Sequence, residues 1–228
     1  MYYVELLVAG LLAGAAYSLS ALGIVVIYKG SGVLNFAQGA VGMVATSAYA
    51  NARHGGNSLG LSLCLGLATA AGLGLAIYLL VMRPLRHSPP SVRMVASFAV
   101  LLILQGFMQL PWGRFRASVP YPIHQHNYHW RGVTLSTNDI LSIAVAVVIT
   151  IGLAAAFRLT TAGRATEAAA LSEQAAMRLG YRVNLLAAGT WVLGSVLAGI
   201  SACACSSRAA TTALASSRRA SFRNARLS

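Results

Sequence analysis

The feature that most restricts the fold of this chain is a series of long runs without one charged side chain, separated by segments that carry lysine or arginine. A helix needs about 20 mostly apolar residues to cross the hydrocarbon core of a bilayer. The pattern therefore predicts an all-α, polytopic transmembrane helical bundle of about six spans, in one domain over residues 1–200. The six runs are residues 6–28, 33–52, 57–82, 94–113, 140–157 and 183–202.

The low charge content excludes a soluble domain. Only 9% of the 228 residues are Asp, Glu, Lys or Arg, whereas roughly a quarter of the residues of a soluble protein are of these types. The net charge of +13 arises because only four acidic residues are present. The basic residues stand between the apolar runs instead of forming one stripe, so we do not expect binding to nucleic acid.

The distribution of basic residues predicts the orientation of the spans. The first, third and fifth connections, at 29–32, 83–93 and 158–182, hold eight Lys and Arg residues. The second and fourth, at 53–56 and 114–139, hold four. Cytoplasmic loops carry the excess of Lys and Arg. We therefore expect the first, third and fifth connections in the cytoplasm and the N-terminus outside.

The second run is unusual because it carries amides near its start. Asn35, Gln38 and Gly39 are spaced so that they would share one face of a helix. Uncharged amides inside a membrane need partners and usually face the bundle interior or a wet cavity. They would either contact a solute along a translocation path or form hydrogen bonds between helices. Their spacing alone does not separate these two interpretations.

The fifth connection contains a polar, Ala-rich segment at 165–179 that is too short and too polar to span. Thr160 or Thr161 is placed to cap a helix there, and Gly180 stands where a C-terminal glycine belongs. Such a helix would carry Glu167 and Glu173 on a surface of mostly small residues. It is either a docking element for a soluble partner or a passive surface helix.

Small residues in the spans predict close helix packing. Gly10 and Gly14 form a G-x-x-x-G pair, and Gly66, Gly72 and Gly74 thin the third run. In lipid, glycine lets two helix backbones approach closely, so we expect these positions to serve helix packing.

Catalytic or metal chemistry has little support in the sequence. His124, His126 and His129 lie in the long fourth connection, but no nearby carboxylate or cysteine completes a ligand set. We expect an exposed polar loop with a short hairpin over 119–133. No phosphate-binding loop or nucleophile–base signature is present, so we expect neither an enzyme nor a cofactor. A membrane-embedded metalloenzyme built on this loop is the alternative.

Several motifs together resemble the LivH-type permeases of branched-chain amino acid ABC importers. The most specific element is Asn-Phe-Ala-Gln-Gly at 35–39, and the ordered set is stronger than any one part. The matching segments are residues 10–19, 21–23, 32–39, 83–86, 161–165, 175–180 and 197–199.

The resemblance implies an inner-membrane subunit of a bacterial importer. Such a permease pairs with a second permease subunit and two cytoplasmic ATPase subunits, and a periplasmic substrate-binding protein delivers the solute. By this resemblance the helix at 165–180 is the element that couples to an ATPase. The implied translocation-path candidates are Asn35, Gln38 and Gly39. The implied coupling candidates are Arg164, Glu167, Glu173, Ala176 and Gly180. A permease for urea or short-chain amides is the alternative within transport.

Two departures from the family pattern carry expectations of their own. The family usually has an apolar residue and then arginine after Gly-Arg-Ala, whereas this chain has Thr166 and Glu167. After Gly199 we expect the resemblance to stop, and residues 201–228, rich in Ala, Ser and Arg, to form a disordered tail. This predicts a truncated or frameshifted permease, with an inactive fragment as the alternative. A genuine basic tail that binds anionic lipid headgroups is the other interpretation.

Overall fold

The computed structural model is an all-α bundle, as the sequence predicts, and it describes residues 2–109, 127–130, 133–161, 163–166, 176–177 and 181–224. Two short irregular helices follow α3: a π-helix, η1 (Tyr78–Met82), and a 3-10 turn, η2 (Pro84–His87). The long helices are α1 (Tyr2–Ser31), α2 (Gln38–His54), α3 (Leu59–Ile77), α4 (Pro90–Gln109), α5 (Thr137–Leu159) and α8 (Val183–Asn224).

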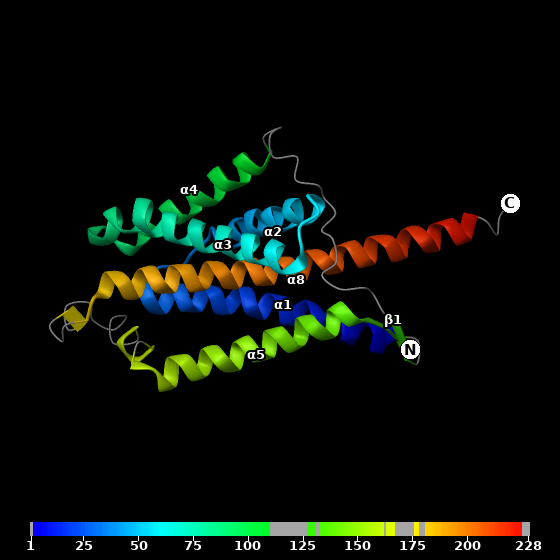
Figure 1. The fold of residues 1–228 in the computed structure, drawn as a ribbon. Helices are drawn as coiled ribbons and strands as arrows, with labels where there is room; N and C mark the ends of the chain where they lie inside the picture. Colours follow the sequence, from blue (N-terminus) through cyan, green and yellow to red (C-terminus); the bar gives the residue numbers. More distant parts are fainter. Residues whose placement is uncertain are drawn as a thin grey trace.

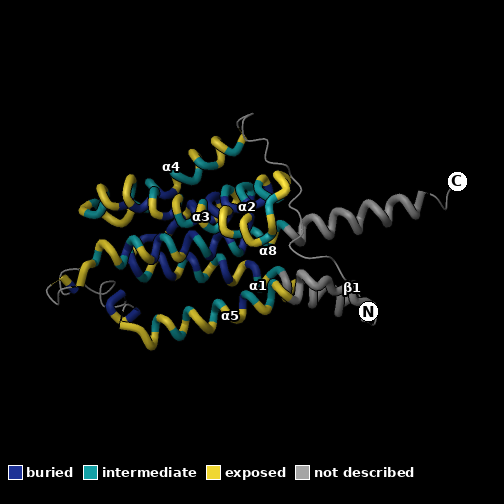
Figure 2. Tube along the Cα trace, viewed as in Figure 1, coloured by how far each residue is buried: buried dark blue, intermediate teal, exposed yellow. Residues whose placement is uncertain are grey.

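The centre of the bundle is the pair α1 and α8, which lie side by side along most of their shared length (Figure 1). Helices α2 and α3 pack against α8 on one side, and α5 follows α1 on the other. Buried residues concentrate where α1, α2, α3 and α8 meet, while α4 and α5 are largely exposed (Figure 2). The core cluster there includes Ile27, Val41, Tyr78 and Trp191.

Five of the described helices are long and apolar enough to cross a membrane, one fewer than expected. The exception is the run at 33–52. Its helix, α2, starts only at Gln38 and has 17 residues, because residues 33–37 are not helical. Helix α2 still runs in the direction opposite to α1 and α3 (Figure 1), so the alternation of loops between the two ends is kept. The five candidate spans are Ala13–Ser31, Leu59–Met82, Pro90–Gln109, Leu141–Leu159 and Val183–Ser206.

The basic connections gather at one end of the bundle, which we call the arginine-rich end. Arg93 Nη1 donates to the carbonyl of Ser31 at 3.2 Å, and Arg86 Nη1 donates to Asn184 Oδ1 at 3.1 Å. Lys29 Nζ lies 5.3 Å from the centroid of the Phe157 ring. These contacts join the ends of α1, α4, α5, α8 and η2, as the charge pattern predicts. That this end faces the cytoplasm stays a prediction.

Glycines bring the central helices into backbone contact. A Cβ added at Gly42 on α2 would lie 2.8 Å from the carbonyl oxygen of Ala198, and one at Gly74 on α3 would lie 2.7 Å from that of Trp191. Such distances leave no room for a side chain, so the helices approach as closely as glycine allows. Gly10 and Gly14 instead face open space. Their expected packing role has no counterpart among the described residues.

The hairpin lies slightly later in the sequence than expected. Strand β1 (Asn127–Trp130) pairs antiparallel with β2 (Val133–Ser136), with His129 opposite Thr134. His124 and His126 lie outside the described residues. Among those that are described, no group of three His, Cys, Asp or Glu side chains is placed to hold a metal ion.

The segment predicted as a disordered tail is helical as far as Asn224. Helix α8 has 42 residues and continues through 201–224 without interruption (Figure 1). Composition misled the prediction because alanine has the highest intrinsic helix propensity. In addition, an existing apolar helix removes the need for a new nucleus.

Candidate functional site

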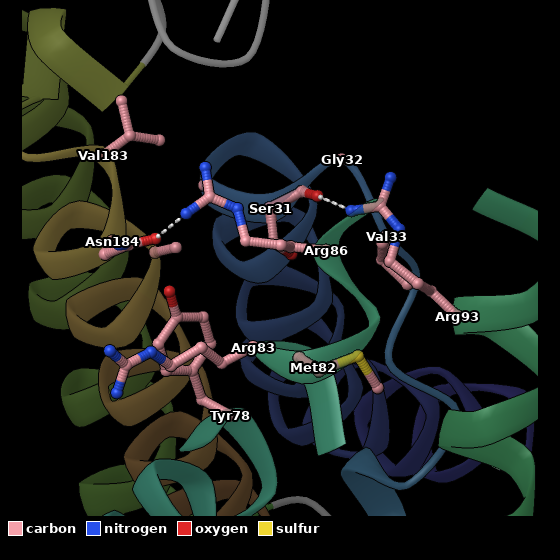
Figure 3. A pocket seen from close by; sticks show the side chains of 12 residues that line it. Ser31, Gly32, Val33, Tyr78, Met82, Arg83, Arg86, Arg93, Val183 and Asn184 are labelled. Carbon is pink, nitrogen blue, oxygen red and sulfur yellow. Dashed lines mark hydrogen bonds between the residues drawn. The ribbon is translucent and has the colours of Figure 1, made fainter. Parts of the chain in front are cut away.

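The first candidate site is a break in helical structure between α1 and α2. Gly32 has a positive φ of 65°, and its N–H donates to the carbonyl of Tyr28 at 2.8 Å. This left-handed conformation ends α1 and suits glycine, which has no Cβ to clash. Residues 33–37 then run without helical structure to the start of α2. The break lies next to the arginine-rich end (Figure 3).

Side chains satisfy the backbone groups that this break leaves without helical partners. The N–H of Ala37 donates to Asn35 Oδ1 at 3.0 Å, so Asn35 forms a turn that leads into α2. The N–H of Phe36 donates to Ser97 Oγ on α4 at 3.3 Å. Irregular backbone at membrane depth is tolerated only where such partners are available within the protein. Asn35 and Ser97 therefore make the break compatible with a membrane.

Gln38 connects the break to the two central helices. Its Nε2 donates to the carbonyl of Gly194 on α8 at 2.8 Å, and its Oε1 accepts from Asn35 Nδ2 at 3.3 Å. The space for this amide comes from Gly23 on α1, where an added Cβ would overlap the Gln38 side chain and lie 2.9 Å from the Gly194 oxygen. Three helices therefore meet around one amide.

Asn35, Gln38 and Gly39 were predicted to share one face of a helix, and the structure shows that they do not. Because α2 begins at Gln38, Asn35 lies outside the helix, and the helical spacing assumed for it does not apply. Asn35 and Gln38 are each 2% exposed, while Gly39 is exposed. The hydrogen bonds described above account for both buried amides within the protein. A contact between these residues and a translocated solute stays a prediction.

Sequence reasoning missed three partners of this site, namely Gly23, Ser97 and Gly194. Ser97 is fully buried although it lies in an apolar run, and a buried hydroxyl in a span must have a partner. That signal was available in the sequence. The two glycines gave no signal, because nothing in a sequence distinguishes a glycine under an amide from one facing lipid.

The second candidate site is the connection between α5 and α8. Thr160 Oγ1 accepts from the N–H of Gly163 at 3.1 Å, so Thr160 is the capping residue of the two that were considered. Arg164 is exposed, and its Nε donates to the Arg158 carbonyl at 3.5 Å. Glu167, Glu173 and Gly180 lie outside the described residues.

Ala176 is 1% exposed, so it contacts the protein itself and offers no free docking surface in this chain. Its neighbour Met177 is 47% exposed. An exposed methionine beside a buried alanine is a better candidate for contact with a partner than the residue that the sequence indicated. A docking role for the connection itself stays a prediction.

Five apolar helices in the described part of the chain, each long enough to cross a membrane, with the buried amides of Asn35 and Gln38 bonded inside the bundle, define a multi-pass α-helical membrane protein. Comparison with known proteins then gives the family: the chain belongs to the family of branched-chain amino acid transport system permease components, whose sequence model matches residues 6–221. The match continues past Gly199, where we expected the resemblance to stop.

Curated relatives agree with this family. The chain is 26% identical over 214 residues to the high-affinity branched-chain amino acid transport system permease protein BraD of Pseudomonas aeruginosa. It is 23% identical over 216 residues to the corresponding protein LivH of Escherichia coli. Each alignment covers 88% of this chain, together with 70% of BraD and 69% of LivH. No solved structure matches the chain.

Proposed function

We propose that this chain is a permease subunit of a bacterial inner-membrane ABC importer for branched-chain amino acids. The observation that carries the proposal is the family match over residues 6–221, together with relatives that are named as high-affinity permeases for this class of solute. The importer would also contain a second permease subunit and two cytoplasmic ATPase subunits, and a periplasmic binding protein would deliver the amino acid.

In this proposal the chain has no catalytic step of its own. ATP binding and hydrolysis on the partner subunits would move the connection between α5 and α8, which includes Arg164 and Met177. That motion would reach α8 directly, because α8 begins where the connection ends. The hydrogen bond from Gln38 to Gly194 would carry it to the break before α2. Coupling of this kind requires two arrangements of a packed element that the partners favour differently.

Within this mechanism we assign Asn35 and Gln38 as positioning residues. They would hold the break in one conformation by the bonds to the Ala37 N–H and to the Gly194 carbonyl. Gly39 is exposed and has nothing within 4 Å of an added Cβ. Of the three it is therefore the one whose surface is available to a solute or a second subunit.

Uptake by proteoliposomes tests the substrate. The chain is reconstituted with its partner permease, ATPases and binding protein, and entry of labelled leucine, isoleucine and valine is compared with entry of urea and acetamide. ATP-dependent uptake of the three amino acids supports the proposal. Uptake of urea without leucine would identify the amide permease instead. Absence of any uptake by a correctly assembled complex would identify an inactive chain.

A charge on the connection tests the coupling role. Met177→Glu places a carboxylate on the exposed apolar surface, and we expect the ATPase subunits to be lost from the complex while membrane insertion is unchanged. Asn51→Glu, an exposed position at the opposite end of α2, is the matched control and should retain the ATPases. Retention of the ATPases by Met177→Glu would remove the docking role of this surface. Ala176 is unsuitable for this test, because a buried carboxylate would disturb folding.

A further inference from the structure

A cavity of about 210 Å³ lies at the arginine-rich end, between the end of α1, the η1–η2 segment, the start of α4 and the start of α8 (Figure 3). Three arginines line it: Arg83 between η1 and η2, Arg86 on η2 and Arg93 on α4. A single water molecule needs roughly 10–15 Å³ of such space. The cavity is therefore large enough for a group of several heavy atoms.

Arg93 and Arg83 have guanidinium N–H groups without a hydrogen-bond partner among the described residues. Each guanidinium has five N–H donors, and the bond from Arg93 Nη1 to the Ser31 carbonyl uses one of them. Arg93 Nε is buried and has no hydrogen-bond partner. Arg83 is exposed, and its guanidinium donates to no group within the described part of the chain. An unpaired buried donor is unfavourable unless a ligand or water satisfies it.

No carboxylate among the described residues offsets this charge. The lining contains no Asp or Glu. The chain has four acidic residues, of which Glu5 lies near the start of α1 and Asp139 near the start of α5, both at the opposite end of the bundle.

The helix dipole of α8 acts in the same direction. Val183 and Asn184 line the cavity with the first turn of α8, and that turn has no acidic residue. A helix N-terminus carries about half a positive charge. Three guanidinium groups and a helix N-terminus therefore surround one space without a counter-charge in the described chain.

We propose that this cavity binds the phosphate of an anionic phospholipid headgroup. The cavity lies where the spans of α1, α3 and α4 end, which is the level of the headgroups. Leu79 and Leu80 of η1, adjacent to the lining residue Tyr78, are 42% and 76% exposed, and so provide an apolar surface along which an acyl chain can lie. Basic pockets between helix ends on the cytoplasmic side favour anionic headgroups. The proposal concerns a lipid and does not depend on which solute is transported.

The experiment measures lipid retained by the purified full-length chain in detergent, by native mass spectrometry. The probes are phosphatidylglycerol, zwitterionic phosphatidylcholine of the same chain length, and inorganic phosphate. The test variant is Arg83→Gln, because loss of a side chain without a described hydrogen-bond partner should leave the fold intact. The matched control is Arg158→Gln, which removes the same charge from an exposed position at the same end, away from the cavity.

We expect phosphatidylglycerol to bind in preference to phosphatidylcholine, and Arg83→Gln to weaken it about tenfold, as loss of one charge-assisted hydrogen bond does. Arg158→Gln should change it less than twofold. Equal binding by Arg83→Gln and the unmodified chain would overturn the proposal. If inorganic phosphate at equal concentration displaces phosphatidylglycerol, the cavity binds free phosphate, and the proposal of a lipid headgroup is wrong.

A third arm separates lipid from protein as the occupant. If an acidic side chain of an ATPase subunit fills the cavity instead, Arg83→Gln will weaken assembly of the complex while retained phosphatidylglycerol stays unchanged, and the proposal fails. Retention of phosphatidylglycerol in the assembled complex, with the same loss in Arg83→Gln, supports it.

Discussion

The amide of Gln38 offers the sharpest test of what the break before α2 does. Gln38→Leu keeps a side chain of similar size but removes both the donor to the Gly194 carbonyl and the acceptor for Asn35 Nδ2. The Gly194 carbonyl lies within α8 and keeps its helical partner. Asn35 Nδ2, in contrast, loses its partner in a site that is 2% exposed.

The size of the effect follows from these two losses. A hydrogen bond between membrane helices contributes about 0.6 kcal/mol on average and about 1.7 at most. A buried donor without a partner costs about 1–3 kcal/mol. Together they predict that Gln38→Leu lowers the free energy of unfolding by about 1.6–4.7 kcal/mol, which is a factor of roughly 15 to 3,000 in the unfolding equilibrium.

The assay is unfolding of the purified chain by added denaturing detergent, with leucine uptake of the reconstituted importer measured in parallel and expressed per folded molecule. Gly39→Ala is the control, because an added Cβ there meets nothing within 4 Å. We expect Gln38→Leu to lose stability and to keep most of its uptake per folded molecule. If stability is unchanged and uptake collapses, Gln38 contacts the solute and the reasoning from its hydrogen bonds is wrong.

Three further predictions use the packing and the orientation of the bundle. Gly74→Ala should lower the free energy of unfolding by about 1–3 kcal/mol, because its Cβ would meet a backbone carbonyl of α8 at 2.7 Å. The control Gly72→Ala adds a Cβ in open space and should change the free energy of unfolding by less than about 1 kcal/mol. Equal effects of the two variants in thermal unfolding would contradict the described packing. Ser97→Ala should cost about 1–3 kcal/mol because the N–H of Phe36 loses its acceptor, and an unchanged unfolding midpoint would show that the break is satisfied in another way. A membrane-impermeant arginine reagent should modify exposed Arg83 only from the cytoplasmic side, and modification from outside would reverse the orientation.

Much of the bundle was predictable because membranes impose simple rules on a sequence. The apolar runs gave the helices, and the bias of Lys and Arg gave the grouping of the loops at two ends. Hydropathy and charge are properties of single residues. The start of α2 was missed because it depends on a contact between residues. Asn35 favours a turn because of one hydrogen bond to the Ala37 N–H, and hydropathy does not report it.

The candidate site was predicted in its residues and not in its arrangement. Asn35 and Gln38 were identified because an amide in an apolar run needs a partner. The partner of Gln38 lies on α8, and the acceptor for the Phe36 N–H lies on α4. Both are more than 50 residues away in the sequence, which offers no rule that pairs them. The cavity between Arg83, Arg86 and Arg93 was missed for a related reason. The sequence showed these arginines as orientation signals, and only the fold places them around one space.

The glycine contacts of the central helices also have a consequence for motion. An added Cβ at Gly194 would lie 2.8 Å from the carbonyl of Gly23, so α1 and α8 meet backbone to backbone at this pair of glycines. The Ile27 side chain packs over Gly194 and belongs to the same buried cluster as Trp191 of α8. Helices α4 and α5 are packed less tightly. Only 11% of the candidate membrane span of α4 and 6% of that of α5 is buried, against 50% for α8. Close backbone contact and tightly packed buried side chains both oppose sliding of one helix along another. A rearrangement that opens a path to one face of the membrane and then to the other would therefore occur at the borders of α4 and α5, around a central group of helices that moves as one rigid body.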